Sequence, residues 1–341
     1  MNMKLSFSIM GLTVLLFVNL LFAADKEALQ KELEVHKARS ESTWRAFAGG
    51  EIKNRIVPAP DVILDYIKKD NQVQGYKEIP KRPEIEPGFF SDIVNAVTEL
   101  PPLARGHIEK HVVAIFLVEE LGGTGYTELL RDFANNRQGF IVLDVGSLNR
   151  KANEWITWKA NSPFAKKNGY IIEAEIEQKK DDTRKASIQY ILVHEVGHLL
   201  GVAYGAHPNW LKGGHPQKWA FTKLSWLTSG QGLDGQSKFD TAFTNRVKLK
   251  FYSFKNAPLT TNEIDETYTQ LLNTNFVSLY AATNMYDDFA ETYGMYVHVV
   301  LQNRQWKIRI IKEGKTVREI VNPILDKRCE NKKIYLDKMF K

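Results

Sequence analysis

The clearest periodic pattern in the chain is "DDTRKASIQYILVHEVGHLLGVAYG", where apolar residues recur at the spacing of a helix. These residues are Ile188, Ile191, Leu192, Val196, Leu199 and Leu200. Asp182, Thr183 and Ser187 are the candidate N-caps, and Gly201 or Gly205 would end the helix. The pattern predicts one long helix.

Three shorter stretches before this helix favour strands. Residues 111–118 and 139–144 are apolar and β-branched, and residues 169–177 alternate apolar and polar in part. All three fall between about 110 and 178. We therefore expect a small mixed sheet beside the long helix.

The flanking regions have weaker patterns. Residues 25–70 are rich in Ala, Leu, Glu and Lys and predict helices, interrupted at Gly49-Gly50. A connector with three prolines follows and ends near residue 88. Residues 205–265 predict loops with one or two short helices.

Two helices are predicted in the C-terminal part. One runs from Glu263 to Leu272, and another begins near Asn284, a residue that favours the N-cap position. The tail from 296 to 320 is compatible with paired strands or with a continued helix. The whole pattern indicates an α+β fold that is mostly helical.

The first 24 residues form a pattern typical of a secretory signal peptide. Lys4 supplies a short basic region, an apolar run extends to Phe22, and Ala23 and Ala24 are small residues suited to cleavage. The alternative is an uncleaved anchor, because the run is just long enough to span a bilayer. Both interpretations place the rest of the chain outside the cytoplasm, in the periplasm or the extracellular space.

The cysteine count and the net charge limit the kinds of site and binding partner that the chain could have. The chain has 341 residues and one cysteine, Cys329, which excludes an intramolecular disulfide and a Cys-rich structural zinc site. The thiol is expected to be buried and inert. The net charge of +6 comes from Lys and Arg residues spread along the chain. This favours a basic surface that could associate with anionic envelope polymers or lipids, and no motif indicates nucleic acid.

The long helix contains His194-Glu195-Val196-Gly197-His198, which fits the pattern H-E-x-x-H. Residues four apart on a helix lie on one face, so the two imidazoles can bind one tetrahedral zinc ion. Glu195 beside them can accept a proton from water. Gly197 inside an apolar helix indicates that another segment packs closely there.

A catalytic zinc site needs a third protein ligand. The longer metzincin pattern would place a third histidine where this chain has Tyr204, so that pattern fails. His207 and His215 are weak candidates in a Gly-rich loop.

A carboxylate from the later helix is favoured as the third ligand. Asp287 and Glu291 are four residues apart and share a helix face. One could bind the metal while the other accepts the second N–H of a ligand histidine. Asp288 would cap the helix or face solvent.

The stretch "SLYAATNMYDDFAETYG" resembles the second zinc motif of the anthrax lethal factor-like metallopeptidases, a gluzincin group that includes the Pro-Pro endopeptidases. The matching residues are Tyr280, Thr283-Asn284, Asp287 and Phe289-Ala290-Glu291. The resemblance implies a zincin-type catalytic domain over residues 89–341, preceded by a helical segment over 25–88. It also implies Asp287 as ligand, Glu291 as its support and Tyr280 as a catalytic tyrosine. The family has glutamate where this chain has Asp287, so Glu291 could instead take over as ligand.

These residues predict an exported zinc metallopeptidase acting on a peptide or protein substrate. Glu195 would be the general base, and Tyr280 would stabilise the oxyanion. A peptide could add to the edge of the strand at 139–146 or at 169–177. Two alternatives remain: a cell-wall amidase with the same zinc chemistry, and a non-catalytic envelope protein stabilised by zinc.

Overall fold

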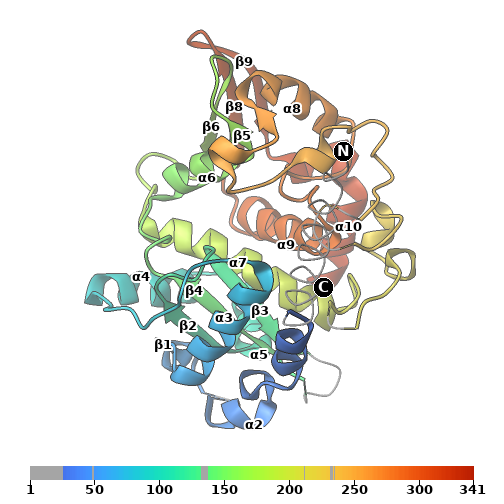
Figure 1. Ribbon diagram of the computed structural model, residues 1–341. Helices are drawn as coiled ribbons and strands as arrows, with labels where there is room; N and C mark the ends of the chain where they lie inside the picture. The colour runs from blue at the N-terminus through green and yellow to red at the C-terminus, as the bar shows by residue number, and fades with distance from the viewer. Residues whose placement is uncertain (1–25, 48–49, 132–136, 211, 231–232, 234) are drawn as a thin grey trace, which may run out of the picture.

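The computed structural model describes residues 26–47, 50–131, 137–210, 212–230, 233 and 235–341 (Figure 1). It has the α+β architecture that the sequence predicts, with small mixed and antiparallel sheets. The predicted signal peptide, residues 1–24, lies outside the described residues. Among the residues described, no helix combines the length and apolar character needed to span a bilayer.

The largest sheet has four strands in the order β1-β2-β4-β3. The strands are β1 (Ile56–Pro58), β2 (Val112–Val118), β3 (Gly125–Leu129) and β4 (Gly139–Asp144). β1, β2 and β4 are parallel, whereas β3 pairs antiparallel with β4. The predicted strands at 111–118 and 139–144 are confirmed as β2 and β4. Because β4 lies inside this sheet, it cannot offer a peptide the free edge predicted for 139–146; β3 forms that edge.

Both faces of this sheet are covered, which explains the nearly continuous apolar run of β2. Ile115 and Ile141 belong to the core that contains α7 (Arg184–Ala203). Phe116 and Phe140 pack on the opposite face against Trp44 and other side chains of the N-terminal segment. The sheet therefore supports the long helix on one side.

The N-terminal segment shares this sheet. Its helices are residues 26–35, α2 (Glu41–Trp44) and α3 (Asp61–Gln74), and its strand β1 pairs with β2. The boundary at residue 88 stays a prediction from the sequence. The structure places β1, from before that boundary, next to a strand that follows it.

A second sheet is antiparallel, with the order β6 (Ile171–Glu175), β8 (Lys307–Lys312) and β9 (Lys315–Val321). Residues 169–177 do contain the predicted strand, but the expectation that it joins the same sheet as 111–118 and 139–144 is wrong. Its partner is the C-terminal hairpin, and local sequence patterns carry no information on such a distant pairing. A short parallel pair, β5 (Phe164–Ala165) and β7 (Leu259–Thr260), completes the strands described.

The structure describes six further α-helices. They are α4 (Pro87–Thr98), α5 (Pro102–His111), α6 (Ala152–Asn161), α8 (Ile264–Leu272), α9 (Met285–Met295) and α10 (Glu330–Met339). α8 and α9 match the two helices predicted in the C-terminal part, and the Asn284 side chain caps α9 by accepting from Tyr286 N and Asp287 N. The tail contains both predicted alternatives: a π-helical turn (Tyr296–Leu301) continues α9, and strands β8 and β9 follow.

α7 and α9 lie side by side in the centre of the molecule (Figure 1). The Thr183 side chain caps α7 by accepting from Ala186 N. At the contact between the helices, a Cβ on Gly197 would lie 2.8 Å from Ala290 Cα. The close packing predicted at Gly197 is therefore confirmed, and glycine brings α9 within reach of the H-E-x-x-H side chains.

Candidate metal centre

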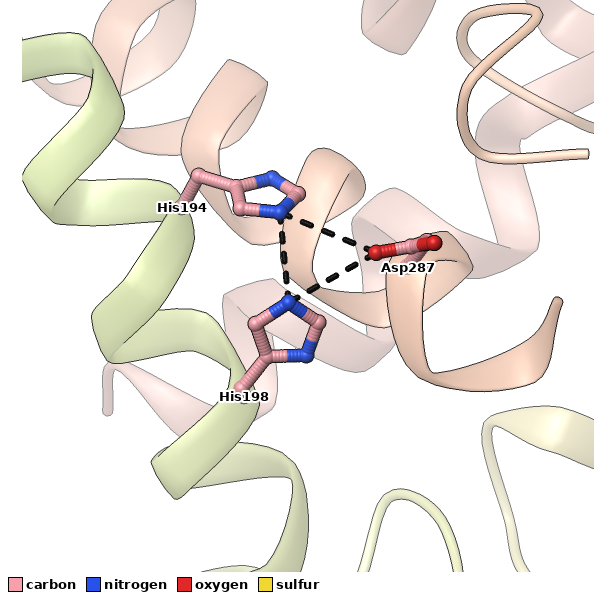
Figure 2. Close-up of side chains that lie close together, drawn as sticks. All are labelled: His194, His198 and Asp287. Atoms are coloured by element: carbon pink, nitrogen blue, oxygen red, sulfur yellow. Dashed lines mark hydrogen bonds and ion pairs between the residues drawn. The ribbon is translucent and has the colours of Figure 1, made fainter. Parts of the chain in front are cut away.

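Three side chains from the contact between α7 and α9 point toward one another (Figure 2). His194 and His198 project from α7, and Asp287 projects from the first turn of α9. The two Nε2 atoms are 3.2 Å apart, and Asp287 Oδ1 lies 3.8 Å from His194 Nε2 and 3.6 Å from His198 Nε2. This buried group could hold a metal ion.

The spacing of these three atoms fits one ion. Zinc–nitrogen and zinc–oxygen bonds near 2.0–2.1 Å in a tetrahedron place neighbouring ligand atoms about 3.3–3.4 Å apart. The observed separations of 3.2, 3.6 and 3.8 Å bracket that value closely enough for small side-chain adjustments to complete the set. Two imidazole nitrogens and a carboxylate oxygen also form a donor set that zinc accepts.

Glu291 lies behind His194 and outside the group of three. Its Oε1 is 2.9 Å from His194 Nδ1 and 2.7 Å from Lys159 Nζ, and its Oε2 accepts from Ser278 Oγ at 2.8 Å. His194 Nδ1 lies close to this carboxylate but makes no hydrogen bond in the observed ring orientation; an N–H on Nδ1 would have to turn toward Oε1 to leave Nε2 unprotonated for a metal. Asp287 therefore belongs to the group of three, and Glu291 contacts His194 at its other ring nitrogen.

Glu291 is ionised despite its burial. Desolvation raises the pKa of this carboxyl, but Lys159 and His194 outweigh that effect and hold the pKa well below its usual range. Lys159 is thus a residue that the sequence analysis missed: it lies in α6, only 4% exposed, with no motif around it.

Asp287 is held by the cap of its own helix. Its Oδ2 accepts from Thr283 Oγ1 at 2.9 Å and from Asn284 Nδ2 at 2.6 Å. With that oxygen engaged, Oδ1 remains directed at the two histidines (Figure 2). The close approach of the helices at Gly197 explains how an aspartate, one methylene shorter than glutamate, reaches the group.

The Glu195 side chain extends from α7 toward the edge strand β3. The Thr127 hydroxyl donates to Glu195 Oε2 at 2.6 Å. A Cβ on Gly125 would lie 2.5 Å from Glu195 Oε1, so only glycine leaves room for the carboxylate. Burial raises the pKa of Glu195, while His194 and Thr127 oppose the rise. These are conditions that suit a base operating near neutral pH.

Tyr280 lies beside the same histidine, with ring centroids of Tyr280 and His194 5.6 Å apart. Lys159 Nζ sits 3.9 Å above the tyrosine ring, and Phe251 packs against the ring edge-on at 4.8 Å. Burial and the neighbouring Asp287 carboxylate raise the pKa of Tyr280 well above its ordinary value. The hydroxyl therefore keeps its proton at neutral pH and can donate a hydrogen bond.

The two loop histidines are not part of the three-residue group. His207 is fully buried against Tyr286 and Phe289, and burial lowers its pKa to about 4. His215 caps a short 3-10 helix by accepting from Gln217 N.

Asp288 corrects a prediction of the sequence analysis. It neither caps α9 nor faces solvent: it is fully buried, 2.5 Å from Lys332 Nζ, and accepts from Trp226 Nε1 at 3.0 Å. The sequence could not show this, because Lys332 comes from α10, and the two residues are 44 positions apart.

Cys329, in contrast, is a free and buried thiol, as expected.

Comparison of the chain with protein-family models, with curated proteins and with solved structures finds no match.

Proposed function

We propose that this protein is an exported zinc metallopeptidase. The observation that carries the proposal is the convergence of His194 Nε2, His198 Nε2 and Asp287 Oδ1 on one point, with Glu195 next to them. A site that only stabilised the fold would need no ionisable base beside its ligands. The raised pKa of Glu195 and the protonated Tyr280 both favour hydrolytic chemistry.

A zinc ion bound by these three residues would polarise a peptide carbonyl and lower the pKa of a water molecule. Glu195 takes the proton of that water and passes it to the leaving amine. Tyr280 donates its hydroxyl hydrogen to the oxyanion that develops on the carbonyl oxygen. Glu291 and Lys159 keep His194 oriented, and Thr127 fixes the Glu195 carboxylate.

The edge strand β3 is the favoured place for an extended peptide. It lies at the edge of its sheet, and its Thr127 touches the proposed base. A peptide that pairs with this edge would carry its backbone past Glu195 and the metal position. This replaces strand β4, which is interior, as the proposed surface for strand addition.

The variant Glu195→Gln tests the proposal. Gln keeps the size of the side chain but cannot accept a proton, so cleavage of a peptide library should fall by at least about 100-fold. Zinc content, measured by mass spectrometry of the dialysed protein, should stay at the wild-type level. His194→Ala should lose the zinc.

Full cleavage by Glu195→Gln would refute the mechanism. A zinc-loaded wild type that leaves all peptides intact would favour the zinc-stabilised envelope protein instead. Release of peptides from cell-wall fragments, with proteins and linear peptides left intact, would favour the amidase.

A further inference from the structure

A cavity of about 560 Å³ lies next to the candidate metal centre, and none of the proposed catalytic residues lines it. Its walls include Glu78, residues between 119 and 124 that lead into β3, residues between 144 and 150 at the end of β4 and after it, and the aromatic residues Trp158, Tyr252 and Phe254. The cavity therefore borders the edge strand along which a peptide would bind.

The cavity and the metal centre share a wall. Thr124, in the cavity, immediately precedes Gly125, where a Cβ would lie 2.5 Å from Glu195 Oε1. Thr124 and Tyr252 both line the cavity, and the ring centroids of Tyr252 and Tyr280 are 6.4 Å apart. A peptide at Glu195 would thus have a neighbouring side chain within reach of this cavity.

Three aromatic rings form one side of the cavity. Tyr252 and Phe254 pack against Trp158, with centroid distances of 5.3 and 5.5 Å. Fully buried Ser162 holds the loop in place: its Oγ accepts from Tyr252 N at 2.9 Å, and its backbone oxygen accepts from Phe254 N at 2.8 Å. Tyr252 is 39% exposed, so part of this aromatic surface is open to a ligand.

Unusual backbone conformations concentrate at this cavity. Glu120, Tyr252 and Phe254 have φ of 59°, 59° and 44°, the left-handed region that non-glycine residues rarely adopt. Among the residues that the structure describes, six non-glycine residues have positive φ, and three of them line the cavity. Such strained positions cluster at ligand sites, where the surrounding structure maintains them.

The rim of the cavity is acidic although the chain as a whole is basic. Glu78, Glu119, Glu120 and Asp144 line it together with a single cation, Arg150. Asp144 is committed to its own turn, because its two oxygens accept from Leu121 N and Ser147 N.

The carboxylates of Glu119 and Glu120 remain accessible. Lys81 lies 3.4 and 2.9 Å from them, but all three side chains are at least 36% exposed. Such exposed pairs exchange partners at little cost. The Arg150 guanidinium lies 4.7 Å over the Trp158 ring, so a cation on this aromatic surface is already part of the structure.

We propose that this cavity is the subsite for a lysine or arginine side chain of the substrate. The aliphatic stem would lie on the exposed Tyr252 ring, beside the Trp158 face that Arg150 covers, and the charged end would reach Glu119 and Glu120. The inference rests on the proposed peptidase function, since it names the class of peptide that the same site selects. An acidic side chain at this position would be repelled.

The experiment compares two peptides that differ only in charge at one position. In a peptide that the zinc-loaded protein cleaves, each position near the cleaved bond is occupied in turn by lysine and by norleucine, which lacks the ammonium group. At one position the lysine peptide should show a kcat/KM about tenfold higher. In the variant Glu119→Gln/Glu120→Gln this ratio should fall to near one, through KM and not kcat.

Glu313→Gln is the matched control. Glu313 is an exposed glutamate with φ of 49°, in the turn between β8 and β9. The variant Glu313→Gln should therefore retain the lysine preference of the wild type. Equal cleavage of the lysine and norleucine peptides by the wild type would overturn the subsite. A preference that survives in Glu119→Gln/Glu120→Gln would overturn it as well.

A wild type that cleaves no peptide would refute the proposed function and not yet the subsite. The subsite is then decided by binding, with fluorescein-labelled lysine and norleucine peptides titrated against the zinc-loaded protein and followed by anisotropy. Tighter binding of the lysine peptide, lost in Glu119→Gln/Glu120→Gln, supports it. Equal binding of the two peptides, or binding of neither, overturns it.

Discussion

Two buried lysine–carboxylate pairs lie on different faces of α9, and they differ in what else the carboxylate contacts. Lys159 pairs with Glu291 at 2.7 Å, and Lys332 pairs with Asp288 at 2.5 Å. Glu291 faces α7 and also contacts His194. Asp288 faces α10 and contacts the indole of Trp226.

The electrostatics of the two carboxylates also differ. Desolvation raises the pKa of Asp288 above its ordinary value, although Lys332 opposes the rise. At Glu291 the same desolvation is outweighed by Lys159 and His194, and the pKa is lowered. A lysine–carboxylate pair is therefore buried in the core on one face of α9, whereas on the other face a second such pair contacts a candidate metal ligand.

The largest effect is expected from Lys332→Met, which leaves Asp288 buried without its cation. Removing one partner of a buried pair costs about 3–5 kcal/mol. The free energy of unfolding, measured with urea on the metal-free protein, should fall by that amount. The zinc affinity of the folded variant should not change, because Lys332 contacts no residue of the metal centre.

The double variant Lys332→Met/Asp288→Asn is the control. Asn removes the unpaired charge and can still accept from Trp226 Nε1, so it should recover part of the lost stability. A large loss of zinc affinity in the folded Lys332→Met variant would show that the two faces of α9 are coupled.

A second effect is expected from Glu291→Gln. The amide still reaches Lys159 and Ser278 but no longer places a negative charge next to His194 Nδ1. Loss of such a supporting carboxylate typically weakens metal binding by about 10–100-fold. Zinc affinity, measured by competition with a chromophoric chelator, should fall in this range.

Asp288→Asn is the matched variant on the other face of α9, and its zinc affinity should equal that of the wild type. An unchanged affinity in Glu291→Gln would contradict the supporting role. Complete loss of zinc in Glu291→Gln, with zinc retained in Asp287→Ala, would show that Glu291 is the ligand.

The smallest effect concerns a buried histidine that has no carboxylate beside it. His298, in the turn that continues α9, faces the backbone oxygens of Ile176 and Gln305. Burial lowers its pKa to about 4 from an ordinary 6.5. As the pH falls below 6.5 the unfolded chain takes up the proton first, so stability is lost between pH 6.5 and 4.

At pH 5.5 this loss amounts to about 1.4 kcal/mol relative to neutral pH. His298→Gln keeps an N–H donor for the Ile176 oxygen but has no proton to gain. The decrease in the free energy of unfolding from pH 7.5 to 5.5 should therefore be smaller by that amount in the variant. Equal decreases in the two proteins would show that His298 does not titrate as its surroundings imply.

Much of the candidate site follows from local patterns. The helical period places His194 and His198 on one face of α7, and Asn284 marks the start of α9. The same spacing separates Asp287 and Glu291 from Asp288. Because these rules involve residues within a few turns of one another, the sequence alone could predict the two histidines of the candidate metal centre and narrow the third side chain to Asp287 or Glu291.

The sequence by itself determined that the two histidines share one helix face with Glu195 next to them in the chain, and that a later helix carries the third side chain. Only the tertiary structure decided which carboxylate faces the two Nε2 atoms and which contacts His194 Nδ1. It also added Lys159, which is 132 residues from Glu291 in the chain, and Thr127 on an edge strand that no apolar pattern marked. The reason is physical: spacing along a helix follows from backbone geometry, whereas contacts between distant segments depend on how the whole core packs.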